Sequence, residues 1–207
     1  MKRIGIIGRG FVGSAVAHGF SEATGYKAEI KVFDKDPLKS THSLEELVTT
    51  SEIIFISVPT PSNKDGSINL DILSDCLGEI NDIANQLDCF NGIYLIRSTV
   101  VPGTTRFFQE EFPKLKLVFN PEFLTERSAN FDFINQSRFI LGGSDENTKV
   151  ASDLYKDRFG DKLPDSVATD SARKEYNEKK ESKPEIVFKP RSKLRLKPKG
   201  KTAKKTK

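Results

Sequence analysis

The residues with the clearest chemical potential form a glycine-rich run near the N-terminus. The run has the spacing G-x-G-x-x-G and consists of Gly8, Arg9, Gly10, Phe11, Val12 and Gly13. An acidic residue, Asp34, follows 21 positions after the last glycine. This spacing, between a strand and a helix, is typical of a loop that holds the pyrophosphate of a dinucleotide.

Each position of the run has its own expected role. Gly8 would permit a tight turn, Gly10 would let backbone amides approach a phosphate, and Gly13 would let a helix pack close to a strand. Phe11 and Val12 open that helix, whose first N–H groups and partial positive charge favour phosphates. The sequence therefore predicts a dinucleotide cofactor bound at Gly8, Gly10, Phe11, Val12 and Gly13.

The acidic residue indicates which dinucleotide. The Asp34 carboxylate would accept hydrogen bonds from ribose hydroxyls and repel a 2′-phosphate, which favours NAD over NADP. Lys35, which stands next to Asp34, is also expected to contact the cofactor. Its positive charge weakens the preference for NAD over NADP. The alternative is a glycine-rich turn in a domain that binds no nucleotide.

Three further polar segments follow apolar runs. They read VPTPS at 58–62, RSTVVPGT at 97–104 and NPEFLTER at 120–127. In this order, behind the glycine run, they resemble the UDP-glucose/GDP-mannose dehydrogenase family over residues 1 to about 160. The resemblance is to the N-terminal NAD-binding domain of that family.

The resemblance implies an activity and a set of site residues. Enzymes of the family oxidise the C6 alcohol of a nucleotide sugar, such as UDP-glucose, to a carboxylate with two NAD. By motif position, Thr60 would contact the cofactor. Thr99 would contact the cofactor and hydrogen-bond water or substrate at the reacting carbon. Glu122 would lie at the substrate site, and Glu126 would activate water and transfer protons.

Structural explanations compete with these roles. Asn120, Pro121 and Glu122 also read as an N-cap, a first-turn proline and a first-turn acid of a helix. Glu126 could be a solvated helix residue, and Thr99 could simply end a strand. A metal site is not expected, because the chain has only two histidines and two cysteines. Cys76 is expected in the core, and the other cysteine matches no catalytic motif.

The elements that would position these residues alternate along the first 160 positions. Apolar runs rich in Val, Ile and Phe predict strands at 3–8, 29–34, 52–58, 92–98, 115–120 and 137–142. Helical spacing of apolar residues predicts helices at 11–23, 44–48, 70–87, 104–112 and 146–159. Alternating strands and helices predict a doubly wound parallel α/β Rossmann sheet that binds ligands at the carboxyl ends of its strands.

Charge divides the chain into two expected parts. Residues 1–160 carry 17 Lys and Arg against 22 Asp and Glu, a net of −5, and form the predicted NAD-binding domain. Residues 161–207 carry 16 basic against 7 acidic residues, a net of +9. This basic tail cannot bury much apolar surface, so we expect it to be disordered, or partly helical at 174–183.

Three functional interpretations remain open. The family's nucleophilic cysteine motif, GGSCFPKD-like, does not occur in the sequence. The chain could be a truncated oxidoreductase, lacking the central and C-terminal domains and completed by a partner chain. It could be an NAD-binding module without turnover of its own.

In the third interpretation the tail binds an anionic surface or nucleic acid. Nucleic acid is not favoured, because the ten basic residues of 189–207 have no aromatic residue between them for base stacking. The scarcity of cysteine favours a reducing, cytoplasmic setting, and no apolar run approaches the length of a membrane span.

Overall fold

A computed structural model describes residues 1–86, 92–160 and 165–169. The described chain folds around one seven-stranded sheet in the order β2-β1-β3-β4-β5-β6-β7. The strands are β1 (Arg3–Ile7), β2 (Glu29–Phe33), β3 (Ile53–Ile56), β4 (Ile93–Ile96), β5 (Lys116–Phe119), β6 (Phe139–Gly143) and β7 (Asp165–Thr169). The α-helices are α1 (Phe11–Gly19), α2 (Leu44–Thr50), α3 (Asp71–Gln86), α4 (Thr104–Glu111), α5 (Ala129–Ile134) and α6 (Asp145–Phe159). Two short 3₁₀ helices complete the set, η1 (Glu22–Thr24) and η2 (Glu126–Ser128).

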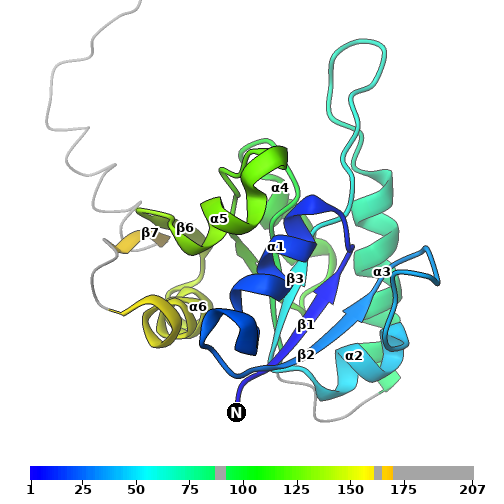
Figure 1. The fold of residues 1–207 in the computed structure, drawn as a ribbon. Coiled ribbons are helices and arrows are strands. Elements are labelled where there is room, and N and C mark those ends of the chain that lie inside the picture. Colours follow the sequence, from blue (N-terminus) through cyan, green and yellow to red (C-terminus); the bar gives the residue numbers. More distant parts are fainter. Residues whose placement is uncertain (87–91, 161–164, 170–207) are drawn as a thin grey trace, which may run out of the picture.

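Helices cover both faces of the sheet (Figure 1). Helices α1, α5 and α6 pack on one face, and α2, α3 and α4 pack on the other. Successive strand residues point to opposite faces, so Phe55 joins the first layer while Ile54 and Ile56 join the second. All three side chains are fully buried, which explains why the sequence of β3 is apolar without alternation. The predicted Rossmann-type α/β fold is confirmed.

The direction of one strand differs from the prediction. The sheet is mixed, because β6 pairs antiparallel with β5 through Phe119 and Gly142. Strands β1 to β5 are parallel throughout. A parallel crossover must carry the chain back along the sheet, but between β5 and β6 the chain forms only η2 and the six-residue α5. That helix spans about 9 Å, so the chain enters β6 from the end at which it left β5.

The sheet continues past the expected end of the domain. Strand β7 pairs parallel with β6 and lies at 165–169, within the segment assigned to the basic tail. The sequence of β7 has no long apolar run, so its pattern did not predict a strand. The helix expected at 174–183 and the rest of the tail lie outside the described residues. Within the described part, no helix is long and apolar enough to cross a bilayer.

Candidate functional site

The glycine run forms the turn from β1 into α1. Gly8 has a φ of +90°, and a Cβ at Gly8 would lie 2.5 Å from the carbonyl oxygen of Ser57. A Cβ at Gly13 would lie 1.9 Å from the carbonyl oxygen of Gly8. Side chains are therefore excluded at both positions, one by backbone conformation and one by the close approach of the helix to the turn.

Gly10 differs from Gly8 and Gly13 because it faces open space. It is the N-cap residue of α1, and no atom lies within 4 Å of the position that a Cβ would take. Gly10, Phe11 and Val12 line a cavity of about 540 Å³. The N-terminus of α1 thus presents backbone N–H groups to an open cavity, an arrangement suited to a phosphate.

The same cavity is lined by the carboxyl ends of β3 and β4 and by the loop after β5. Its other lining residues are Ser57, Val58, Pro59, Thr60, Ser62, Ile68, Arg97, Ser98, Thr99 and Glu122. Ser62 and Ile68 form a bridge at the base of the hairpin that projects between β3 and α3 (Figure 1). The cavity lies where the chain order of the strands reverses, between β1 and β3, which is the usual ligand site of such sheets.

Asp34 lies at the end of β2, outside the residues that line the cavity. Its Oδ2 accepts a hydrogen bond from the N–H of Arg9 (2.6 Å), and its Oδ1 accepts one from the N–H of Asp36 (2.9 Å). Partial burial raises the pKa of Asp34, but these hydrogen bonds and nearby Lys39 hold the pKa below its usual value. The carboxylate is therefore ionised at neutral pH and stands beside the glycine turn. Lys35 is exposed next to it.

Two predicted residues from different motifs meet directly. The Thr60 hydroxyl donates to the carbonyl oxygen of Thr99 (2.8 Å), and the Ser98 hydroxyl donates to the carbonyl oxygen of Val58 (2.7 Å). These bonds connect the loops after β3 and β4 at the cavity wall. Sequence reasoning found Thr60 and Thr99 by motif and did not single out Ser98.

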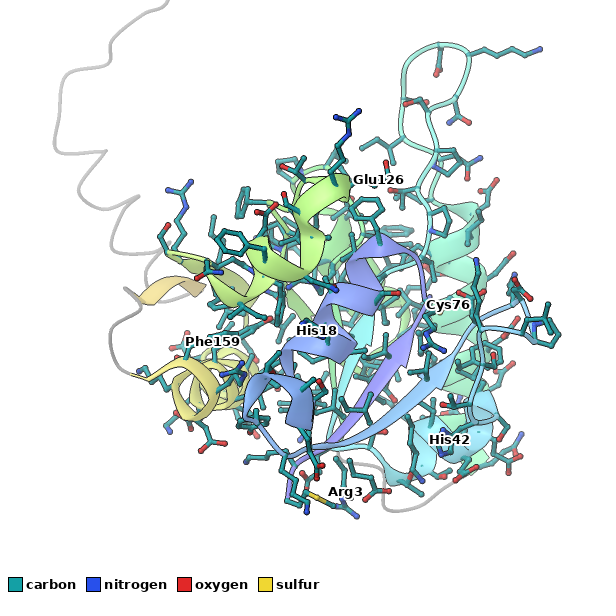
Figure 2. All side chains as sticks on the ribbon, viewed as in Figure 1. Arg3, His18, His42, Cys76, Glu126 and Phe159 are labelled. Atoms are coloured by element: carbon teal, nitrogen blue, oxygen red, sulfur yellow. The ribbon has the colours of Figure 1, made fainter. Side chains whose placement is uncertain are left out.

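The structure separates the two predicted glutamates. Glu122 lines the cavity, and its Oε2 accepts a hydrogen bond from the N–H of Leu124 (2.5 Å). Residues 121–125 are not helical, so the interpretation of this segment as a helix start is wrong. Glu126 is the first residue of η2, is exposed, and is not among the cavity-lining residues. Figure 2 shows it at the end of the molecule from which the hairpin projects.

A buried polar group behind the cavity was not predicted. Arg97 follows β4 and is 1% exposed, and its Nη1 donates to Asn120 Oδ1 (2.8 Å) and to the Tyr155 hydroxyl (3.3 Å). The Tyr155 hydroxyl also bonds Asn120 Oδ1 (2.5 Å). The sequence signal for it was that Arg97 directly follows an apolar strand. In the sequence analysis Arg97 was considered only as part of the RSTVVPGT motif.

Cys76, the cysteine that the structure describes, is buried. Cys76 lies on the buried side of α3, where burial and the nearby Glu79 carboxylate raise the pKa of its thiol to about 12. The expectation that Cys76 belongs to the core is confirmed. His18 lies on α1 (Figure 2) and is not among the residues that line the cavity. Cys89 lies outside the described residues.

The comparison with known families decides what kind of domain carries this cavity. The NAD binding domain of the UDP-glucose/GDP-mannose dehydrogenase family matches residues 25–158. The chain belongs to this family. The match covers Asp34, Thr60, Thr99, Glu122 and Glu126, and the glycine run precedes it. NAD is the cofactor of the family's domain, and the open space at Gly10 fits the approach of its phosphates.

Relatives of the family agree with the match. The UDP-glucose 6-dehydrogenase of Campylobacter jejuni is 28% identical over 193 residues, which is 82% of this chain and 49% of that protein. Among solved structures, a UDP-glucose dehydrogenase from Pyrobaculum islandicum has a TM-score of 0.64 at 25% identity, over 88% of this chain and 49% of that one. A GDP-mannose dehydrogenase from Pseudomonas aeruginosa has a TM-score of 0.67 at 22% identity, over 87% and 49%. The chain spans about half the length of these family members.

Proposed function

We propose that this chain is the NAD-binding half of a nucleotide-sugar 6-dehydrogenase, which oxidises the C6 alcohol of a sugar such as that of UDP-glucose. The observation that carries the proposal is the single cavity that joins the glycine turn to Thr60, Thr99 and Glu122. A dinucleotide site and the family's substrate motifs therefore share one space, as hydride transfer between cofactor and sugar requires.

Several residues would hold the cofactor. The N–H groups around Gly10, Phe11 and Val12 face the cavity and would bind the pyrophosphate. The ionised Asp34 would accept hydrogen bonds from the ribose, with Lys35 beside it. Bound NAD supplies a hydride acceptor. Thr60 would contact the cofactor, and its hydroxyl is held in place by the hydrogen bond to the carbonyl oxygen of Thr99.

The remaining motif residues would act on the substrate. Thr99 and Glu122 border the cavity and would contact the alcohol carbon and the groups around it. Glu122 is half-buried, so its carboxylate oxygens would accept hydrogen bonds from a bound substrate or water. Glu126 follows four residues later on the exposed η2, so its assignment to proton transfer rests on the motif alone.

Completion of the oxidation would need a group from elsewhere. The family resemblance implies a thiolate that captures the intermediate aldehyde before the second hydride leaves. Cys76 cannot serve, because its thiol is buried and protonated. We therefore propose that a partner chain supplies the second half of the site, and that the chain alone binds NAD without completing the reaction. The basic tail carries ten Lys and Arg within residues 186–207, and these residues would bind a partner or an anionic surface.

Calorimetric titration of the purified chain with NAD tests the cofactor proposal. Binding is expected at or below millimolar NAD, and its absence at that concentration would refute the proposal. Gly10→Ala is the matched variant that should weaken binding without unfolding the domain.

A turnover assay tests the need for a partner. The chain alone, given UDP-glucose and NAD, should not release two NADH per sugar. If it does, no partner is needed. If it does not, a pull-down with the tagged chain should recover a protein that restores NADH formation at 340 nm.

A further inference from the structure

Arg97 places a buried positive charge behind the cofactor cavity. Its side chain is 1% exposed, and the residue borders the cavity together with Ser98 and Thr99. No Asp or Glu of the described residues forms an ion pair with it. Buried charges in proteins are normally paired, so this arrangement is costly unless the site uses the charge.

The neighbours of Arg97 hold the guanidinium without neutralising it. Nη1 is fixed by Asn120 and Tyr155, and the guanidinium carbon lies 5.5 Å from the centre of the Phe133 ring. Nε and Nη2 are buried and have no hydrogen-bond partner among the described residues. The full positive charge therefore acts through a medium of low polarity, where its field reaches further than it would in water.

The two redox states of a nicotinamide dinucleotide differ in charge. The oxidised ring carries a positive charge that hydride transfer removes, whereas the pyrophosphate is the same in both states. The strand order places the glycine turn and Asp34 at the ends of β1 and β2, and Arg97 at the end of β4, across the reversal point. A dinucleotide extended across this edge brings its other half toward β3 and β4.

We propose that Arg97 sets the redox preference of this site, by disfavouring the oxidised cofactor relative to the reduced one. The inference rests on the proposed NAD binding. Glu122 brings an opposite charge to the same cavity, but it is half-exposed and its field is screened by water. The buried cation therefore dominates, and the bound couple is a stronger hydride acceptor than free NAD. Arg97 would thus promote oxidation of the substrate without touching it.

The measurable quantity is the ratio of the dissociation constants of NAD⁺ and NADH. For charges on the order of 10 Å apart and an effective dielectric constant of about 20 to 40, Coulomb's law gives a roughly 4- to 16-fold effect on this ratio. The pyrophosphate contributes equally to both constants and cancels. General damage to the fold would weaken both forms alike, so the ratio separates an electrostatic role from a structural one.

The test titrates the full chain with NADH by fluorescence and with NAD⁺ by calorimetry. Wild type should bind NADH at least about fourfold more tightly. Arg97→Met should remove most of this preference, and Arg97→Lys, which keeps the charge, should retain it. Arg158→Met is the control, because Arg158 bonds the carbonyl oxygens of Gly19 and Thr24 and does not line the cavity.

Two results would overturn the inference. One is a wild-type ratio at or below one, which needs no variant to be folded. The other is an Arg97→Met chain that binds both forms with the wild-type ratio; Arg97→Gln gives the same comparison if the Met variant does not fold. A wild-type chain that binds neither form would instead refute the proposed function.

Discussion

Gly10 and Gly13 stand three residues apart in one turn, and replacing each by alanine should have different consequences. A methyl group at Gly13 would lie 1.9 Å from the Gly8 carbonyl oxygen, where ordinary contacts begin at 3.4 Å. A methyl group at Gly10 would meet no protein atom within 4 Å. The first change should therefore damage the fold, and the second should act mainly on the ligand site.

The expected magnitudes follow from these distances. Gly13→Ala forces α1 to move about 1.5 Å from the turn, and overpacking of this kind typically costs about 1–3 kcal/mol. In a chain of this size the melting temperature should fall by roughly 2–12 °C. Gly10→Ala weakens a helix N-cap, at a cost of about 1 kcal/mol or less. Its methyl group occupies space that a phosphate would use. Losing one charge-assisted hydrogen bond, worth about 1.5–3 kcal/mol, should weaken NADH binding roughly 10- to 100-fold.

Gly78 provides a matched control in the same chain. It lies inside α3, away from the cavity, and an added methyl group would meet no atom within 4 Å. Gly78→Ala should raise the melting temperature by about 2–4 °C, since alanine is favoured over glycine inside helices by about 1 kcal/mol. Its NADH affinity should equal that of wild type.

Thermal unfolding without ligand and fluorescence titration with NADH read out all three variants. The reasoning would be refuted if Gly10→Ala bound NADH as wild type does. It would also be refuted if Gly10→Ala lost as much thermal stability as Gly13→Ala.

Three further predictions concern titration and buried polar groups. The folded pKa of Asp34 lies below its usual value of about 3.9, so the stability that its carboxylate contributes is complete above that pH and is lost on acidification. The difference in melting temperature between wild type and Asp34→Asn should therefore shrink below about pH 4. A difference that grows there would contradict this. In a Cys89→Ser variant, the Cys76 thiol should react with a thiol reagent at pH 8 only after unfolding, because burial raises the pKa of this thiol to about 12. Rapid labelling of the folded chain would contradict this. Tyr155→Phe removes the hydroxyl that bonds Asn120 and should cost about 1–2 kcal/mol, measured by urea unfolding against wild type; an unchanged midpoint would mean that the buried network contributes nothing.

The sequence alone was sufficient wherever the relevant interactions are local. Central strands such as β3 were recognised because a strand buried on both faces must be apolar at every position, as in Ile53–Ile56. The glycine turn was recognised because its backbone and close packing exclude side chains at Gly8 and Gly13. The family resemblance added Thr60, Thr99 and Glu122, and the fold brings all three to the cavity.

Long-range contacts were decided by the tertiary structure. Whether β6 runs parallel or antiparallel depends on how far the short α5 can carry the chain, and no local pattern encodes that. The segment at Glu122 has good helix-starting residues but forms a loop along the cavity instead.

Arg97 illustrates the same limit for function. As a residue type it is a mobile, solvated cation, and sequence reasoning had no cause to place it in a core. Burial against Tyr155, Asn120 and Phe133 came only with the packing of α5 and α6 on the sheet. The sequence by itself determined a Rossmann-type domain with a dinucleotide-binding turn, because those features follow from local chain geometry. Only the tertiary structure placed behind the cavity a charge with no ion-pair partner among the described residues, because charge pairing depends on which distant segments meet.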